Sequence, residues 1–278
     1  MMHLSPQLRR RTPTAVLALI LLFAVSATAS TAQEAPMHDS KQAFSHADWT
    51  TVLKRFVDDR GFVDYEGLAR DRAVFDRYIR AIEEASPSSA PQRFPTRSDA
   101  LAYYINAYNA HVFNGVLARG PEKKSVWRGL VSGLNFFVRM KVTVGGESMN
   151  LKSLEEKIIL KQFKDPRVHA AINCASISCP RLIQEAFEPE HLDQQLDAVM
   201  REWVNDPTHL KVDEAGKKVR LNKIFDWFSG DFLGFEKRNG TQNANQIDYV
   251  NRFRSPEQQI PRSYSISFLP YNKGINAQ

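Results

Sequence analysis

The residues best suited to chemistry lie in the stretch DPRVHAAINCASISCPRL, residues 165–182, which holds both cysteines of the chain. His169 lies five residues before Cys174, and Cys179 follows five residues after it. A thiolate is a nucleophile and a metal ligand, and an imidazole is a base and a metal ligand near neutral pH. These residues could therefore form a catalytic thiol site, a zinc site or a disulfide.

In a catalytic thiol site, Cys174 or Cys179 would be the nucleophile and His169 its base, with an asparagine or an acid orienting the imidazole. Cysteine and histidine need only meet in space, so their spacing in the sequence neither proves nor excludes this arrangement. A helix N-terminus, where reactive cysteines commonly lie, is not evident at either cysteine.

In a zinc site, His169, Cys174 and Cys179 would be ligands, and His191 or Glu155 would supply a fourth. The two cysteines lack the C-x2-C spacing of a zinc knuckle, and no motif for a phosphate or a cofactor is present. We therefore expect no metal and no cofactor.

In a disulfide, Cys174 and Cys179 would close the short loop CASISC, which carries Ser176 and Ser178. A turn within four intervening residues can bring two cysteines to bonding distance. Closing so short a loop would stabilise the fold by about 2 kcal/mol. The export signal described next favours this pairing, because two nearby cysteines in an oxidising compartment are usually paired.

The first 32 residues have the order of a secretory signal peptide. Three arginines at 9–11 precede an apolar run from Ala15 to Val25, and small residues allow cleavage after Ala29 or Ala32. The apolar run is shorter than the roughly 20 residues of a membrane span. We therefore expect a periplasmic or secreted protein with a flexible tail over residues 33–43, one domain over residues 44–278 and no membrane span.

The charge of the expected mature chain does not favour nucleic acid as a partner. The signal peptide holds three of the 37 Lys and Arg residues and none of the 31 Asp and Glu residues, so the net charge falls from +6 to +3. No stripe of Lys and Arg of the kind that binds nucleic acid is visible. We expect a small molecule or a component of the cell envelope as the partner.

The elements around the cysteines include a long helix over residues 96–119 with a broad apolar stripe. Thr96 or Ser98 could cap its start. Asn106 and Asn109 lie on one face of this helix, and buried amides must be hydrogen-bonded. They could brace neighbouring backbone, or they could line a pocket as an oxyanion donor or as the support of an imidazole.

The other elements alternate between helices and strands. A hairpin is expected about Gly145-Gly146 and a second one over residues 209–221, and residues 263–276 form an extended run. Ser153 and Glu156 have the spacing of a capping box. RVHAAIN, residues 167–173, is interpreted as a short buried strand that places His169 and Asn173 on one face. The fold class expected is α+β: a mostly helical single domain with two short β-hairpins and a small sheet.

Three blocks of the sequence resemble the DUF547 family, a family of domains of unknown function. They are DALAYYINAYNAHVFNGVL from residue 99, VTVGGESMNLKSLEEKII from residue 142 and the cysteine-bearing stretch from residue 165. The resemblance extends over roughly residues 45–275. The motif residues of the family correspond here to Asn106, Tyr108, Asn109, His169, Asn173, Cys174, Ser178, Cys179 and Pro180.

The order of the elements also resembles transglutaminase-like and papain-like folds, in which a cysteine begins the central helix. In this chain Asp99, Ala100 and Leu101 occupy that helix start. Two hypotheses follow. The protein is a hydrolase-like enzyme with a site centred on His169, Asn106, Asn109, Asn173 and Cys174, or it is a non-catalytic, disulfide-stapled envelope binding or interaction module.

Overall fold

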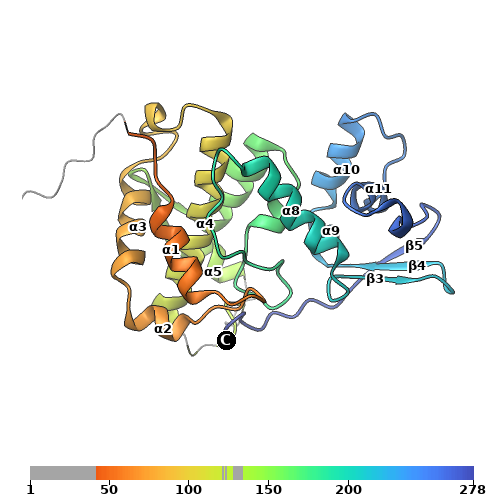
Figure 1. Ribbon diagram of the computed structural model, residues 1–278, viewed down its shortest axis with the longest axis horizontal. Coiled ribbons are helices and arrows are strands. Elements are labelled where there is room, and N and C mark those ends of the chain that lie inside the picture. Colours follow the sequence, from red (N-terminus) through yellow and green to blue (C-terminus); the bar gives the residue numbers. More distant parts are fainter. Residues whose placement is uncertain (1–41, 121, 123, 128–133) are drawn as a thin grey trace, which may run out of the picture. The chain divides into compact units, whose positions relative to one another are not determined.

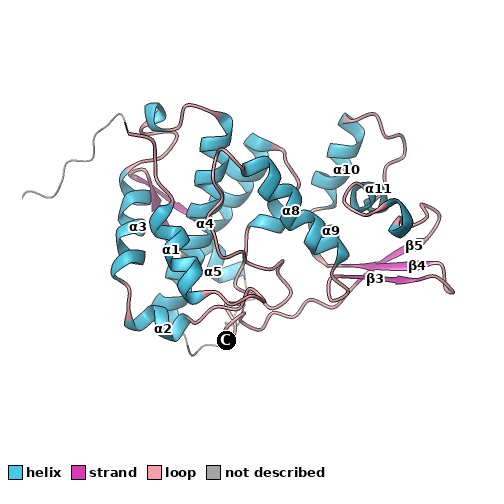
Figure 2. Cartoon of the chain, in the orientation of Figure 1, coloured by secondary structure: helices cyan, strands magenta, loops and turns pink. Residues whose placement is uncertain are grey.

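The computed structural model describes residues 42–120, 122, 124–127 and 134–278. The expected signal peptide and residues 33–41 of the expected tail lie outside the described residues, so export and the cleavage site stay predictions. The described chain is mixed α+β, about half helical, with two small sheets. The predicted fold class is confirmed at this level (Figure 2).

The helices and strands follow one another along the described chain as in Figure 1. Their bounds are α1 (Ala47–Phe56), α2 (Tyr65–Arg70), α3 (Ala73–Glu84), η1 (Pro91–Arg93), α4 (Arg97–Arg119), α5 (Leu134–Arg139), β1 (Lys141–Val144), β2 (Glu147–Asn150), α6 (Leu151–Ser153), η2 (Leu154–Phe163), α7 (Val168–Ala171), α8 (Leu192–Asn205), β3 (Leu210–Asp213), β4 (Lys218–Leu221), α9 (Ile224–Trp227), α10 (Ser229–Arg238), α11 (Gln246–Asn251), η3 (Pro256–Gln258) and β5 (Ser265–Phe268).

The long helix α4 is the central element, as predicted. A reciprocal capping box begins it, because the Thr96 hydroxyl accepts from the Asp99 N–H at 3.1 Å and the Asp99 carboxylate accepts from the Thr96 N–H at 2.9 Å. Gly120, with φ 97°, ends it. Most of the side chains between are buried, and the helix packs against α2, α3, α6 and η2.

Both predicted hairpins are present. Strands β1 and β2 pair antiparallel about Gly145 and Gly146, whose φ angles of 57° and 82° are those that glycine adopts without strain. Strands β3 and β4 form the second hairpin, and β5 adds to it in parallel, so that Val219 pairs with Ile266. This three-stranded sheet lies beside α9 and α11 (Figure 2).

The predicted capping box of Ser153 and Glu156 is wrong. Asn150 caps the helix instead, its side chain accepting from the Ser153 N–H at 2.8 Å. After one turn the helix widens into the π-helix η2. A π-helix of ten residues is unusual, and π-helical turns in proteins are frequent at functional sites.

The strand predicted over residues 167–173 is also wrong, since Val168–Ala171 form the one-turn helix α7. The Asp165 side chain accepts from the Arg167 N–H at 3.0 Å, and the Asp165 oxygen accepts from the Val168 N–H at 3.2 Å. Pro166 is the second residue of this turn, a position that proline favours. Every side chain of α7 is buried. The sequence of residue types therefore could not distinguish the 3.6-residue period of a helix from the two-residue period of a strand.

The chain returns to the helical part after β5. Backbone hydrogen bonds join Ile275 to Lys124 at 3.0 Å and Asn276 to Ala175 at 3.3 Å. This return places Tyr271 beside the cysteine-bearing loop.

Candidate functional site

The two asparagines of α4 brace backbone. Asn106 binds both polar groups of the Phe187 backbone, donating to the oxygen at 2.8 Å and accepting from the nitrogen at 3.0 Å. Asn109 donates to the Ala171 oxygen at 2.9 Å and accepts from the Asn173 N–H at 2.8 Å. Asn109 therefore fixes the end of α7 and the start of the cysteine loop, and both asparagines have the first of their two predicted roles.

Asn173 shapes the cysteine loop from within. Its side chain donates to the Pro180 oxygen at 2.9 Å and accepts from the Ala175 N–H at 2.8 Å. Ala175 has a φ of 56°, a left-handed conformation that a residue other than glycine rarely adopts. The loop therefore turns sharply between the two cysteines, and Asn173 supports the turn.

The two loop serines bind neighbouring segments. Ser176 accepts from the Trp127 indole N–H at 2.7 Å, and Ser178 accepts from the Asn272 N–H at 2.8 Å. Ser176 thus attaches the loop to Trp127, and Ser178 attaches it to the C-terminal segment.

The predicted disulfide between Cys174 and Cys179 is wrong, because both thiols are free and they are not at disulfide distance. The Tyr271 hydroxyl lies 3.1 Å from Cys174 Sγ and 3.2 Å from Cys179 Sγ, so it bridges the two sulfurs. The oxidising compartment that the sequence suggests does not determine the distance between the two sulfurs in this loop.

The two thiols differ in their electrostatics. Burial acts to raise the pKa of Cys179, but hydrogen bonds from the Cys174 thiol, the Tyr271 hydroxyl and the backbone N–H groups of Cys174 and Ser176 lower it below its usual value. The Cys174 N–H lies 3.1 Å from Cys179 Sγ. Burial and the neighbouring Cys179 raise the pKa of Cys174 well above its usual value. Cys179 is therefore the more acidic of the two thiols.

Both thiols lie on the wall of a cavity of about 360 Å³. His169, Glu155, Glu156 and Lys152 also line it. The rest of the wall is mainly aromatic, and its aromatic members are Tyr108, Trp127, Phe137, Trp227, Phe228 and Tyr271. An apolar cavity with a few polar groups at one place is the usual form of a small-molecule site.

Glu155 is the second group of this wall with a displaced pKa. Burial raises its pKa to about 7, although the Tyr108 hydroxyl donates to the Glu155 carboxylate at 3.0 Å and acts in the opposite direction. A carboxyl with this pKa can give and take a proton at neutral pH. Glu155 lies in the first turn of η2, and Tyr108 reaches it from α4.

His169 lines the cavity from α7. Its partner is neither of the α4 asparagines, since His169 Nε2 lies 2.9 Å from the carboxylate of Asp231. The imidazole is 2 % exposed and packs on Phe228 and Phe232, with ring centroids 4.4 Å and 5.2 Å away. When Nε2 donates to the Asp231 carboxylate, Nδ1 is the other nitrogen of the ring and does not face Asp231.

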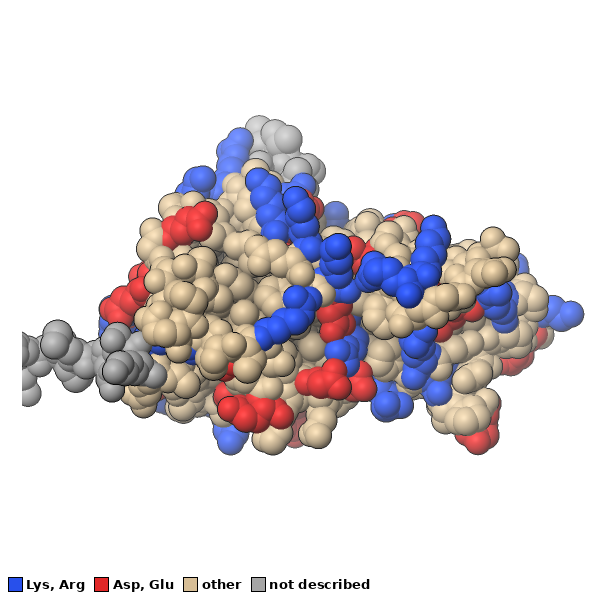
Figure 3. Space-filling model, turned by 90° about the horizontal axis from the view of Figure 1, so that it is seen from above, with Lys and Arg blue, Asp and Glu red and all other residues tan. Residues whose placement is uncertain are grey.

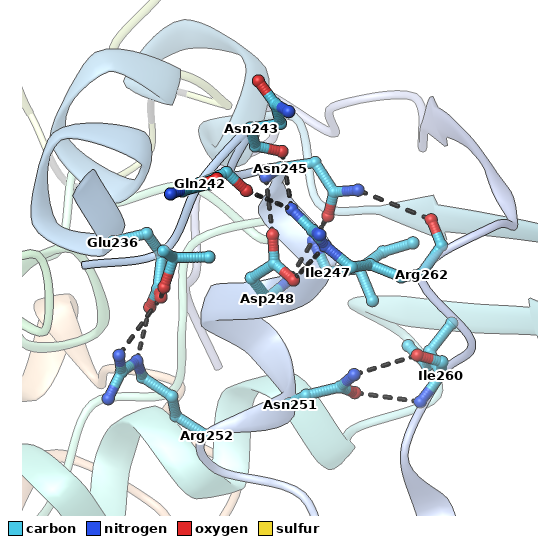
Figure 4. Close-up of polar contacts among 11 residues, drawn as sticks. Glu236, Gln242, Asn243, Asn245, Ile247, Asp248, Asn251, Arg252, Ile260 and Arg262 are labelled. Atoms are coloured by element: carbon cyan, nitrogen blue, oxygen red, sulfur yellow. Dashed lines mark hydrogen bonds and ion pairs between the residues drawn. The ribbon is translucent and has the colours of Figure 1, made fainter. Parts of the chain in front are cut away.

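Polar contacts between α10 and α11 hold the helix that carries Asp231 (Figure 4). Glu236 of α10 is buried, and Arg252 binds it through two nitrogens, one of them at 3.1 Å. Asn251 donates to the backbone oxygen of Ile260 and accepts from its nitrogen, both at 2.9 Å. The Glu236–Arg252 pair therefore attaches α10, the helix that carries Asp231, to the end of α11.

The remaining alternatives concern metals and membranes. Within the described residues, no group of three or more His, Cys, Asp or Glu side chains is placed to hold a metal ion, so His191 and Glu155 do not join His169 and the thiols in a zinc site. Among the helices that the structure describes, none is long and apolar enough to cross a membrane.

Residues 92–204 match the family DUF547, described as a protein of unknown function. The resemblance predicted from the sequence is confirmed over this range. Searches of curated proteins and of solved structures found no match, and the transglutaminase-like or papain-like fold is not confirmed.

The DUF547 match contains both cysteines, His169, Glu155 and Tyr108, but the wall continues beyond it. Trp227, Phe228, Asp231 and Tyr271 all follow residue 204. Sequence reasoning missed Tyr271 and Asp231 as site residues and weighed Glu155 only as a zinc ligand. Glu155 is followed by Glu156 and Lys157, so no local pattern marked it as a buried carboxyl.

Proposed function

We propose that this protein is a cysteine-dependent acyl hydrolase or acyl transferase, with Cys179 as the nucleophile. The observation that carries the proposal is the set of donors around Cys179 Sγ on the wall of a largely apolar cavity. A buried thiol normally has a raised pKa and little reactivity, whereas donors aimed at the sulfur favour the thiolate.

The proposed reaction has two steps. The Cys179 thiolate attacks the carbonyl carbon of an ester or thioester, the bond to the leaving group breaks, and the leaving group takes a proton from the Glu155 carboxylic acid. Water or another acceptor then attacks the acyl-enzyme thioester and gives its proton to the Glu155 carboxylate. Cys179 leaves as a thiolate, so the enzyme returns to its starting state with all atoms and charges balanced.

The pKa of about 7 suits Glu155 to this double task, because comparable amounts of its acid and its carboxylate exist at neutral pH. His169 lies on the same wall and is oriented by Asp231 at 2.9 Å. We assign His169 to positioning the acyl group, because the proton cycle closes through Glu155 alone.

The proposal is tested with a series of p-nitrophenyl esters of straight-chain acids and with mass spectrometry of the intact protein. We expect a covalent acyl adduct on Cys179 and loss of turnover in Cys179→Ala. Cys174→Ser is the matched control, since serine retains a donor toward Cys179 and should preserve most of the turnover.

The opposite pattern supports the other predicted class. Absence of an adduct with every ester, together with ligand binding in the cavity, would mean that the domain is a binding module and that the thiols have no covalent role. Export to the periplasm or the medium is proposed separately on the signal-like N-terminus, and N-terminal sequencing of the exported protein tests it.

A further inference from the structure

A second hollow, of about 540 Å³, adjoins the cavity. Glu156, Trp227 and Phe228 line both, so the two share a wall. His169 faces the cavity, and its partner Asp231 faces the second hollow. A ligand that fills the apolar cavity can therefore extend past these aromatic rings into the hollow, which we call the side groove.

The side groove carries three cations, namely Lys161, Lys164 and Arg238. In the described part of the chain, no carboxylate lies within ion-pair distance of any of the three. Arg238 is held in place by its bond to the backbone oxygen of Lys164 at 3.1 Å. Figure 3, which views the molecule from above, shows Lys and Arg side chains gathered along the middle of the face it draws.

Two of the three acids of the side groove are paired with cations. Asp165 binds Arg167 at 2.7 Å, and Glu156 lies 3.5 Å from Lys152, whereas Asp231 hydrogen-bonds the imidazole of His169 at 2.9 Å. Three cations therefore stand against one carboxylate without a cationic partner, and the net charge of the side groove is positive. An anion can reach it without displacing an existing ion pair.

We propose that the side groove binds the anionic group of an amphipathic small molecule whose apolar chain occupies the cavity. The inference also gives a substrate class, namely acyl compounds that carry a carboxylate or a phosphate group, and this part rests on the proposed function. As a statement about binding, it depends only on the apolar wall and on the three unpaired cations.

The test compares three ligands that share one chain and differ in the charge of the head group: decanoate, decanol and decyltrimethylammonium. Each is titrated by calorimetry into Cys179→Ala protein, in which no turnover can occur. We expect decanoate to bind roughly tenfold more tightly than decanol, because each exposed ion pair contributes a small factor to affinity. Decyltrimethylammonium should bind more weakly than decanol.

The double variant Lys161→Gln/Arg238→Gln should remove the preference for decanoate and leave decanol binding unchanged. Lys211→Gln/Arg220→Gln is the matched control, because both are exposed cations of the β3–β4 hairpin, away from the groove-lining residues. Equal binding of the three ligands, or a preference that survives in the first double variant, would overturn the inference.

Raising the ionic strength should reduce the preference for decanoate, since exposed charges are screened by salt. Decanoate preference without any ester turnover in the wild-type protein would refute the proposed function and leave the anion site standing. Turnover of neutral esters through Cys179 without any preference for decanoate would refute the anion site and leave the proposed function standing.

Discussion

Replacing Tyr271 by phenylalanine should raise the pKa of Cys179 and slow its alkylation. The change removes one hydroxyl, 3.2 Å from Cys179 Sγ and 3.1 Å from Cys174 Sγ, and keeps the ring that packs on Trp227 with centroids 4.7 Å apart. Burial and the two thiols raise the pKa of Tyr271 well above its usual value, so the hydroxyl stays protonated and donates. Its loss therefore acts mainly on the thiolate.

The magnitude follows from the worth of a hydrogen bond to a charged group, about 1.5–3 kcal/mol. Since one pKa unit corresponds to roughly 1.4 kcal/mol, the pKa of Cys179 should rise by about 1–2 units. At a pH below both values, the thiolate fraction and the alkylation rate should fall by about 10- to 100-fold.

The assay is the rate of reaction with iodoacetamide as a function of pH, with the modified cysteine identified by peptide mapping. Tyr264→Phe is the matched control, because this tyrosine lies in the same C-terminal segment but its hydroxyl binds Glu214. An unchanged midpoint for Cys179 in Tyr271→Phe would refute the assignment of Tyr271 as a donor to the thiolate.

Three further predictions concern proton transfer, pH stability and the bracing of the site. If Glu155 donates the proton in the first step and that step limits turnover, kcat for ester turnover should fall as the pH rises through about 7. Glu155→Gln should then lose most of the turnover and this pH dependence, as measured by kcat at several pH values. Burial lowers the pKa of His46 to about 3 and that of His111 to about 4, so below pH 6.5 the unfolded chain binds protons that the folded chain does not. The free energy of unfolding should therefore fall with falling pH by about 1.4 kcal/mol per pH unit for each histidine. Glu155, whose pKa is raised in the folded chain, has the opposite effect between pH 7 and 4.5 and offsets one histidine there. Urea unfolding at several pH values measures this dependence, and a flat profile would contradict it. Asn109→Ala leaves two buried backbone groups without partners and should reduce the free energy of unfolding by about 2–4 kcal/mol; a loss below about 1 kcal/mol in the same assay would mean that the backbone finds other partners.

The sequence predicted those elements that are determined by residues close to one another in the chain, such as helix caps and tight turns. Thr96 and Asp99 mark the start of α4 and Gly120 marks its end, and Gly145-Gly146 mark a hairpin, because each conformation depends on residues within a few positions. The bracing role of Asn106 and Asn109 could also be foreseen, since a buried amide must find partners.

The errors and omissions have a different cause. The disulfide was inferred from the compartment, which says nothing of the Tyr271 hydroxyl between the sulfurs. The segment 167–173 was misassigned because α7 is buried all round, so helix and strand periods could not be distinguished. Asp231 and Tyr271 reach the site from elements distant in the sequence, and no local pattern in a single sequence specifies such a meeting.

The return of the C-terminal segment also sets the order in which the site can form. Tyr65 donates to Asn276 across 211 positions of sequence at 3.0 Å, and Asn276 in turn lies 3.4 Å from Asn173 of the cysteine loop. A growing chain can fold α1 to α4 early, because their contacts are local, but contacts of such long sequence separation form slowly and only after residue 276 has been made. The Cys179 sulfur therefore lacks its tyrosine donor until residue 271 has been made and the segment that carries it has returned to the cysteine loop.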